Sequence, residues 1–293
     1  MDKILAISLL NRNGLHDTID CIDSLQQSNF QNFDIFLLDN GSKNNEYKKL
    51  HQLYKNQTNI KLQHSPENLW FTGGNNLNLQ EIEKWDYQYI LLLNNDTIIP
   101  HNFLWSFIKQ IQSFWKEGIF SPIIKEFYYK NIVQSSGNSL NLRTWGGKRN
   151  SKVLETIRSF DYVSWACFLI TKKCFEKIWL LDDHFFCYRE ENDYCFRAKK
   201  EGFYSYIIPN TEIFHKEEAA NKKVSAYYTY LMFRNRDLFL KKRATKIQYL
   251  ISWIFLLGYL TILFPKKFWC KQYKYAIKGI VDSYKEKYWG LSF

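Results

Sequence analysis

The sequence predicts an α/β fold, in which helices cover both faces of a mostly parallel sheet, followed by a helical, basic tail. Two observations predict the sheet: short apolar runs alternate with helical patterns over residues 1–215, and short polar turns separate them. The third observation is that residues 1–215 hold 24 basic and 24 acidic residues, so the net charge of +11 lies entirely in residues 216–293. We therefore expect one large domain over residues 1–240 and a separate tail over residues 241–293.

Four apolar runs in the first hundred residues predict buried strands, because each is short, rich in aliphatic side chains and bounded by polar turns. They are residues 4–10, 34–38, 60–63 and 87–93. A helix is expected after each strand. These helices are one with Ile19, Ile22 and Leu25 on a single face, one over residues 45–55, one beginning with the turn at Gly73-Gly74, and one over residues 102–115.

The second half of the sheet region is less regular. Further strands are predicted at residues 119–124, 163–171 and 206–208. Three glycines interrupt residues 125–160, which we expect to form hairpins or a mobile loop. Residues 190–200 predict a helix, because acids fill the first turn and Lys199-Lys200 precede Gly202 at the end.

The six cysteines include no C-x-x-C pair, so a structural zinc site is not expected. The first residues lead directly into a strand-like run and lack the charged start, long apolar stretch and cleavage site of a signal peptide. We therefore expect a cytoplasmic protein with reduced thiols.

Two acidic residues follow predicted strands, where ligands of parallel sheets bind. Asp39 precedes Asn40-Gly41-Ser42 and can accept the imide N–H of uracil or thymine, or ribose hydroxyls; the alternative is an ordinary turn. Asp96 ends Asn94-Asn95-Asp96 and suits a hard divalent cation that bridges two donor phosphates. The alternative for Asp96 is a helix N-cap, which the intervening Pro100 and His101 disfavour.

Glu190-Glu191-Asn192-Asp193 is an acidic cluster among aromatic residues. Apolar neighbours raise the pKa of a carboxyl group, which suits a general base, whereas acids in a first helical turn also simply stabilise the helix dipole. His215 follows the last predicted strand. A neutral imidazole is a good metal ligand, although a lone histidine is more often structural.

Taken in order, these motifs resemble a bacterial family 2 glycosyltransferase with the GT-A fold, of the rhamnosyltransferase-like type. The resemblance covers about residues 3–240. Five stretches carry it: Asn11-Arg12-Asn13-Gly14, Leu38-Asp39-Asn40-Gly41-Ser42, Glu67-Asn68-Leu69-Trp70-Phe71-Thr72-Gly73-Gly74-Asn75-Asn76, Leu92-Leu93-Asn94-Asn95-Asp96-Thr97, and Phe185-Phe186-Cys187-Tyr188-Arg189-Glu190-Glu191-Asn192-Asp193 with Tyr194-Cys195-Phe196-Arg197. It implies an inverting enzyme that moves a sugar from a nucleoside-diphosphate donor, a UDP- or dTDP-sugar such as dTDP-rhamnose, to a hydroxyl of a glycan or lipid-linked acceptor in surface polysaccharide synthesis.

The resemblance also implies roles for single residues. Asp39 would contact the nucleobase. Asp96 would bind Mn²⁺ or Mg²⁺ at the family's D-x-D position, and His215 would complete the metal site. Three asparagines would lie along the donor: Asn75, Asn94 and Asn95. Because Asn94 stands where relatives have the first acid of the motif, it adds no charge at the metal.

Glu191 occupies the base position of the family's E-D motif. Relatives often carry aspartate there, and since glutamate is longer, the role could fall to Asp193 or Glu190. Trp70 and Trp165 stand where relatives usually have glycine. Either narrows a pocket or stacks on the acceptor sugar, or both are packing changes away from the substrate.

Residues 247–264 contain no charged side chain and have basic residues on both sides. As a helix this stretch would span ~27 Å, just short of a ~30 Å hydrocarbon core. Because positive charge on both sides gives no orientation, we expect a helix on the inner membrane surface or a re-entrant hairpin rather than a full span. The alternative is a core helix. The basic tail is thus predicted to meet an anionic membrane, and no nucleic acid partner is expected.

Two other functions are compatible with a fold of this class. A sugar nucleotidyltransferase would need a glycine-rich basic phosphate loop near residue 10, where residues 11–14 offer only Arg12. A non-catalytic glycan- or membrane-binding protein on a transferase-like fold is disfavoured by the intact set of candidate residues, Asp39, Asp96, Glu191 and His215.

Overall fold

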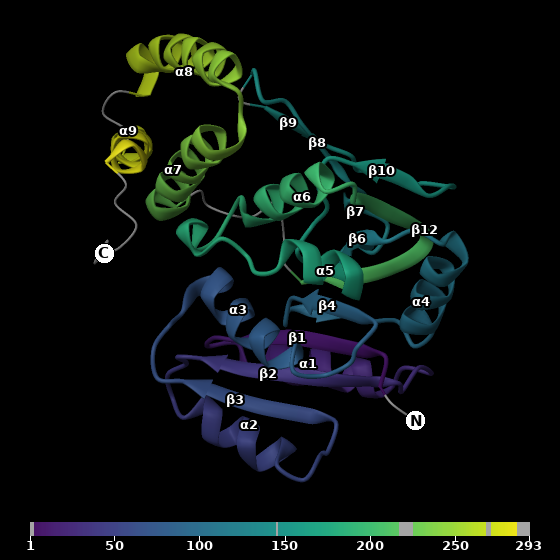
Figure 1. Cartoon of the computed structure of the whole chain (residues 1–293). Coiled ribbons are helices and arrows are strands. Elements are labelled where there is room, and N and C mark those ends of the chain that lie inside the picture. The colour runs from purple at the N-terminus through teal and green to yellow at the C-terminus, as the bar shows by residue number, and fades with distance from the viewer. Residues whose placement is uncertain (1–2, 145, 217–224, 268–270, 286–293) are drawn as a thin grey trace.

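The computed structural model of the chain describes residues 3–144, 146–216, 225–267 and 271–285. Figure 1 shows a central sheet with helices packed on both faces and the C-terminal helices at one end of the molecule. The strands are β1 (Leu5–Asn11), β2 (Phe33–Asn40), β3 (Ile60–Ser65), β4 (Tyr89–Leu93), β5 (Thr97–Ile98), β6 (Gly118–Glu126), β7 (Val133–Ser135), β8 (Asn138–Leu140), β9 (Gly147–Arg149), β10 (Arg158–Phe160), β11 (Cys167–Thr171) and β12 (Tyr204–His215). The helices are α1 (Leu15–Gln26), α2 (Glu46–Tyr54), α3 (Trp70–Ile82), α4 (Phe103–Phe114), α5 (Lys172–Ile178), α6 (Glu190–Lys200), α7 (Ala226–Arg243), α8 (Lys246–Lys267) and α9 (Lys271–Tyr284), with a short 3₁₀ helix η1 (Asp183–Phe185).

Within the described residues, ten strands form the central sheet, in the order β10-β12-β6-β11-β4-β1-β2-β3, with β5 beside β12 and β7 beside β6. The four neighbouring strands β3, β2, β1 and β4 pair in parallel, and so do β6 and β12. Strand β11 lies antiparallel between β4 and β6. The predicted α/β fold with a mostly parallel central sheet is therefore confirmed.

The central strands are apolar on both sides because each side packs against helices. On β1, the odd-numbered Leu5, Ile7 and Leu9 join a buried cluster with side chains of α1, α2 and α4. The intervening Ala6 joins Phe36 in a second cluster with side chains of α3, α5 and α6. Because β1, β2, β3 and β4 pair in parallel, their carboxyl ends lie along one edge of the sheet, where loops can build a site.

The third helix begins earlier than the sequence predicts. A helix starting at Gly73-Gly74 was expected, but α3 already begins at Trp70, and both glycines lie inside it. A side chain at position 74 would collide with the amide of Asn40 and with Leu10. The glycine therefore allows close packing of α3 on β1 and β2, and it does not mark a turn.

Residues 125–160 form hairpins, which was one of the two structures expected for this segment, the other being a mobile loop. Strands β8 and β9 make a separate two-stranded antiparallel sheet. Strand β10 forms an edge of the central sheet beside β12, and β7 pairs with the end of β6. Leu140 and Leu142 at the tip of the β8–β9 hairpin pack against apolar residues of α6, α7 and the start of α8. The hairpin is thus tied to the C-terminal helices.

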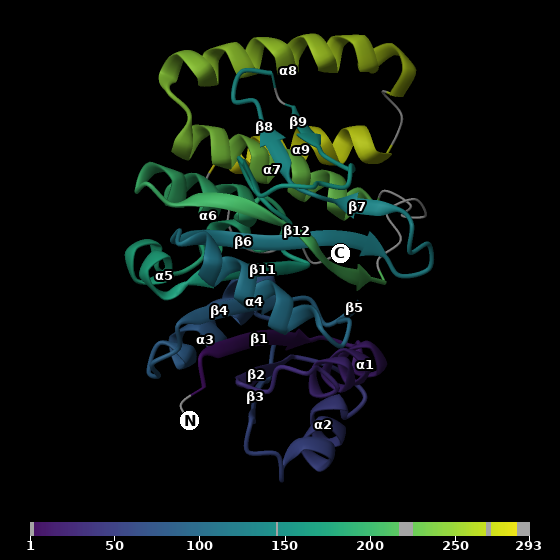
Figure 2. The same cartoon turned by 90° about the vertical axis from the view of Figure 1, so that its right-hand side faces the viewer.

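The three C-terminal helices form a layer beyond α6 (Figure 2). Helix α7 packs closely on α9, whereas α8 lies outermost. The expected boundary between residues 240 and 241 falls inside α7, which ends at Arg243. Among the described residues, none of the helices has the length and apolar character that crossing a membrane requires.

Candidate active site

Three polar side chains meet at the carboxyl ends of β1, β2 and β3. The parallel register sets Asn11 beside Asp39, and Asp39 beside His64. Asn11 donates to one carboxylate oxygen of Asp39 at 2.9 Å, while His64 Nδ1 lies 3.1 Å from the other. Asp39 is fully buried, whereas the His64 side chain is 38 % exposed and stacks on Tyr47. Solvent therefore reaches this cluster through His64 and not through Asp39.

A chain of hydrogen bonds runs from Asp39 towards the end of β4. Asn11 Oδ1 accepts from the Thr18 hydroxyl at 2.8 Å. The same hydroxyl accepts from the Asn95 amide at 2.8 Å. Asn95 stands next to Asp96, so the candidate nucleobase residue and the candidate metal residue belong to one polar network.

Asp96 and His215 come together although 119 positions separate them in the sequence. The cause is the short strand β5, which pairs antiparallel with the end of β12 and sets His215 opposite Thr97. His215 Nε2 lies 3.0 Å from Asp96 Oδ1, and the Asn94 amide lies 3.5 Å from the same nitrogen. The Asp96 side chain is 32 % exposed, so one side of the pair is open.

The hydrogen bond made by His215 Nδ1 determines whether Nε2 carries a proton or a lone pair. Nδ1 lies 2.8 Å from Gln134 Oε1, so in neutral imidazole Nδ1 carries the proton and donates it to that oxygen. The lone pair of Nε2 then faces a carboxylate oxygen, an arrangement that calls for a proton or a cation between the two acceptors. An outward N–H held by a carbonyl oxygen is also how metal-binding histidines are oriented.

Asp96 and His215 fit a divalent cation that takes its remaining ligands from a substrate. The described residues include no group of three or more histidine, cysteine, aspartate or glutamate side chains able to hold a metal. Mg²⁺ in proteins is commonly held by one or two carboxylates together with substrate phosphates. The pair is therefore suited to a metal–diphosphate complex and not to a closed structural site.

The acidic cluster lies at the start of α6, where its members have different surroundings. Glu190 is buried, and its Oε2 forms no hydrogen bond. Burial raises the pKa of Glu190 well above its ordinary value of 4.5, and the neighbouring Glu191 raises it further. Glu191 is only half-buried. Burial raises its pKa too, but Arg189 and the nearby Trp165 indole oppose that rise.

Asp193 is held in two ion pairs. It is fully buried, and its carboxylate accepts from Arg197 Nε at 2.8 Å and from Arg243 Nε at 2.6 Å. Both oxygens are therefore engaged by guanidinium groups that link α6 to the end of α7. This arrangement favours a structural role for Asp193 and leaves Glu191 as the more accessible acid of the cluster.

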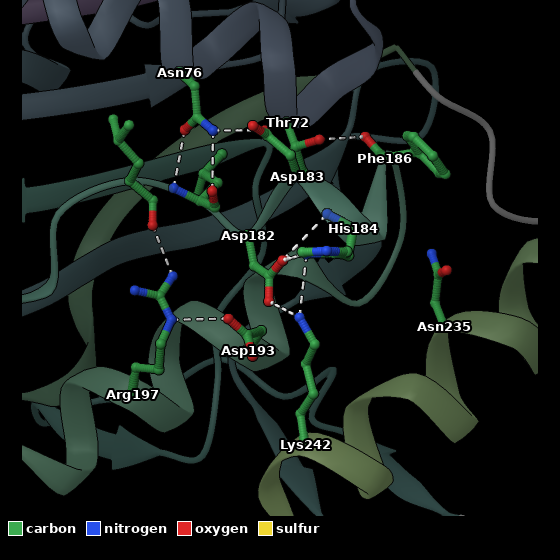
Figure 3. A network of polar contacts seen from close by, with 12 residues as sticks. Thr72, Asn76, Asp182, Asp183, His184, Phe186, Asp193, Arg197, Asn235 and Lys242 are labelled. Carbon is green, nitrogen blue, oxygen red and sulfur yellow. Dashed lines mark hydrogen bonds and ion pairs between the residues drawn. The ribbon is translucent and has the colours of Figure 1, made fainter. Parts of the chain in front are cut away.

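The loop before α6 has an unusual backbone that α7 and α3 hold in place. Phe186, Tyr188 and Arg189 all have left-handed φ angles of 59–76°, which cost energy for residues with a side chain. The buried Asn235 of α7 donates to three carbonyl oxygens of this loop, those of residues 185, 187 and 188, at 2.7–2.8 Å. From α3, Thr72 donates to the Phe186 carbonyl through its hydroxyl (Figure 3). Its backbone N–H donates to the same oxygen.

The remaining candidates take different positions. Asn75 is buried in the interface between α3 and the sheet, with its oxygen accepting from Ser8 and its amide donating to the Phe71 carbonyl. Trp165 is 8 % exposed, packs on Phe168 and Phe71, and lies near Glu191. These contacts favour packing roles for both. Trp70 is half-buried and lies near Phe186 and Tyr227, in an aromatic group beside the loop before α6.

Three residues of the site were not singled out from the sequence. Thr18 links Asn11 to Asn95, His64 pairs with Asp39, and Asn235 anchors the loop before α6. His64 had a usable signal, because it stands near the end of a predicted strand next to that of Asp39. Nothing local marks Asn235, since its partners lie about fifty residues earlier in the chain.

Known proteins show likeness in sequence. Residues 6–179 match the model of glycosyl transferase family 2. The low-salt glycan biosynthesis hexosyltransferase Agl10 of Haloferax volcanii is 27 % identical over 213 residues, which make up 67 % of this chain and 67 % of that protein.

Solved structures show likeness in fold. The S. aureus TarS fragment 1–349 in complex with UDP-GlcNAc has a TM-score of 0.63 at 15 % identity, covering 96 % of this chain and 80 % of that one. The mannosyltransferase PcManGT from Pyrobaculum calidifontis, in complex with GDP-Man and Mn²⁺, has a TM-score of 0.61 at 11 % identity, covering 98 % and 88 %. GalNAc-T7 with UDP, GalNAc and Mn²⁺ has a TM-score of 0.64 at 14 % identity, covering 97 % and 58 %.

Proposed function

Because the chain belongs to glycosyl transferase family 2, we propose that it transfers a sugar from a UDP- or dTDP-linked donor, dTDP-rhamnose among them, to a hydroxyl of a glycan or lipid-linked acceptor. Glycosyltransferase activity and the GT-A fold follow from the family match, the hexosyltransferase relative and the similar structures. One observation carries the proposal: Asp39, the Asp96–His215 pair and the start of α6 all border the edge where parallel strands end. The backbone N–H of Asn94 donates to the Ala166 carbonyl, and Trp165, the residue before Ala166, lies near Glu191. These contacts connect the proposed metal residues to the proposed base.

The choice of UDP or dTDP rests on Asp39. A carboxylate accepts hydrogen bonds and donates none, so it suits the imide N–H that uracil and thymine share. In the proposed complex the base approaches from the side of His64, the exposed partner of Asp39. The Asn11 amide keeps the second carboxylate oxygen in place.

The donor diphosphate is proposed to bind with Mn²⁺ or Mg²⁺ at Asp96 and His215. When bound, the cation would neutralise charge on the diphosphate as it leaves. Among the chain's own residues, Gln134 holds the His215 ring so that Nε2 faces the cation position, and the partly exposed Asp96 supplies the negative charge. The Mn²⁺ named with PcManGT and GalNAc-T7 supports this assignment.

Glu191 is proposed to take the proton of the acceptor hydroxyl. That hydroxyl attacks the anomeric carbon on the face opposite the leaving diphosphate, so a single displacement inverts the configuration. A carboxylate at the attack position removes the proton as the new bond forms. Glu191 suits this role better than its neighbours, because Glu190 is buried and Asp193 is bound by two arginines.

The setting we propose is the cytoplasmic side of surface polysaccharide synthesis, such as that of lipopolysaccharide or capsule, in a bacterium. The five described free cysteines, Cys21, Cys167, Cys174, Cys187 and Cys195, suit a reducing compartment. Glycan biosynthesis is also the role named for the hexosyltransferase relative.

The proposal is tested with nucleoside-diphosphate sugars and manganese. Thermal shift with the UDP, dTDP and GDP series should identify a uracil or thymine donor, and EDTA should abolish transfer. Asp96→Ala should lower turnover by ~10³-fold or more while the fold survives, because the leaving diphosphate loses its counter-charge. Full activity in EDTA, or unchanged turnover of the variant, would refute the metal role.

Two other functions predict different results. A nucleotidyltransferase would form a nucleotide sugar from a nucleoside triphosphate and a sugar phosphate, and the described site has no glycine-rich basic loop after β1 to favour it. A non-catalytic binder would retain glycan without releasing a nucleoside diphosphate. Following nucleoside diphosphate release with acceptor present separates all three.

A further inference from the structure

The outer side of α8 is an apolar surface with no cover among the described residues. Six large apolar residues of this helix are 50–72 % exposed: Ile247, Leu250, Ile254, Phe255, Leu257 and Tyr259. Four of them, Ile247, Leu250, Ile254 and Leu257, recur every three or four residues and form one stripe along the helix. Isolated exposed apolar residues are ordinary, but a continuous stripe marks an interaction surface.

The opposite side of α8 is already satisfied by the protein. Ser252, Leu256 and Leu260 are buried, and the two leucines cluster with Ile280 of α9 and with Phe233 of α7. Figures 1 and 2 both show α8 as the outermost helix, beyond α7 and α9 and at the end of the molecule opposite α2. The apolar stripe therefore faces away from the body of the protein.

The charge around this helix has one sign. In the described parts of the tail, residues 225–267 and 271–285, the carboxylates are Asp237 and Asp282, and both are buried. Exposed basic residues lie at the start of α8, as with Lys246, and on α9, as with Lys274. The β8–β9 hairpin that packs against the same region adds the exposed Arg143. Among the described residues of α8, α9 and the hairpin, the surface thus combines exposed apolar side chains with positive charge and no exposed carboxylate.

We propose that α8 is a docking surface for an anionic lipid bilayer, with the helix lying in the plane of the headgroups and its apolar stripe among the acyl chains. Apolar burial and attraction to anionic headgroups act together in such helices, and a cationic tail meets both requirements. A second copy of the chain fits less well, because an interface between two identical copies of this surface would oppose like charges. Docking of α8 on a bilayer does not depend on the sugar-transfer reaction.

Vesicle flotation of the full-length protein tests the proposal. We expect binding to vesicles of phosphatidylcholine mixed with phosphatidylglycerol, weaker binding to phosphatidylcholine alone, and only partial release by high salt, because salt screens charge but not apolar burial. The double variant I254E/L257E should bind these vesicles at least roughly tenfold more weakly than wild type, since it places two charges where acyl chains would lie.

The matched control is L53E. Leu53 is 52 % exposed, like the α8 residues, but lies on α2 at the far end of the molecule. The L53E variant should bind vesicles as wild type does, and circular dichroism should show that L53E and I254E/L257E are both folded. Equal vesicle binding by wild type and I254E/L257E overturns the proposal. So does sedimentation of wild type as a dimer that the double variant converts to monomer without any vesicle binding.

Discussion

At the scale of single residues, two adjacent glutamates receive different properties from their surroundings. Glu190 points into the protein and has one oxygen without a hydrogen bond, whereas Glu191 is half-exposed and lies between Arg189 and Trp165. Environments that differ in this way let two carboxyl groups of the same type take different roles at one pH. A role in turnover is therefore expected for Glu191, and an effect on stability for Glu190.

Glu191→Gln should lower turnover by ~10²–10⁴-fold, because the amide cannot accept the acceptor's proton during attack. Donor affinity, measured by calorimetry, should not change. In the wild type, burial raises the pKa of Glu191, so activity should fall with decreasing pH at values above the ordinary 4.5 of glutamate. Glu190→Gln and Asp193→Asn are the comparisons, and a larger turnover loss in either would move the base away from Glu191.

Glu190→Gln should stabilise the fold at neutral pH. Because the folded-state pKa of Glu190 is raised, its neutral form contributes stability below pH 4.5 that is lost as pH rises through the folded-state pKa. Removing the charge should therefore raise the free energy of unfolding by ~1 kcal/mol or more near neutral pH. Thermal unfolding at a series of pH values checks this, and a gain that did not shrink below about pH 4.5 would contradict it.

At the scale of elements, α7 determines the shape of the loop that leads to the acidic cluster. Asn235 of α7 satisfies three loop carbonyls, around residues whose left-handed backbone would otherwise be unfavourable. Arg234 adds a bond to the His184 carbonyl at 3.0 Å. The position of Glu191 thus depends on a helix that comes later in the chain.

Asn235→Ala should lower kcat by ~10-fold or more with little change in donor affinity, since it frees the loop before the base but leaves the donor side intact. Asn78→Ala is the matched control. Asn78 is also buried and donates three hydrogen bonds, but it joins α3 to β1 and β2. Both variants should lose stability, on the order of 1–3 kcal/mol, as thermal unfolding would measure. Equal kcat in the two variants would argue that Asn235 has no positioning role.

The elements differ in how well the sequence predicts them. Helix α6 begins and ends where its first-turn acids and last-turn lysines predict, because those signals are local. The start of α3 was missed, since Trp70 adopts a left-handed φ of 62° and Gly74 serves close packing. The Asp96–His215 pair depends on β5 meeting β12, a contact between distant segments that local patterns do not encode.

At the scale of the whole molecule, the proposed active site is assembled from both ends of the described chain. The residues proposed to bind the donor and its cation come from β1, β2, the loop after β4 and the end of β12, while α7 holds the loop before the proposed base. Helix α9 in turn packs on α7 so closely that a side chain at Gly279 would collide with the Tyr230 carbonyl. The family match at residues 6–179 ends before α6, so this second half of the site lies beyond it.

The anchoring of the base loop by α7 has a consequence for synthesis on the ribosome. Domains fold progressively from the N-terminus as the chain emerges. Once β12 has emerged, every residue assigned to the donor is available, but the carbonyls around Phe186 still lack Asn235. We expect a nascent chain at that stage to hold a nucleotide sugar without consuming it, and to begin turnover only when α7 has emerged and folded onto the loop.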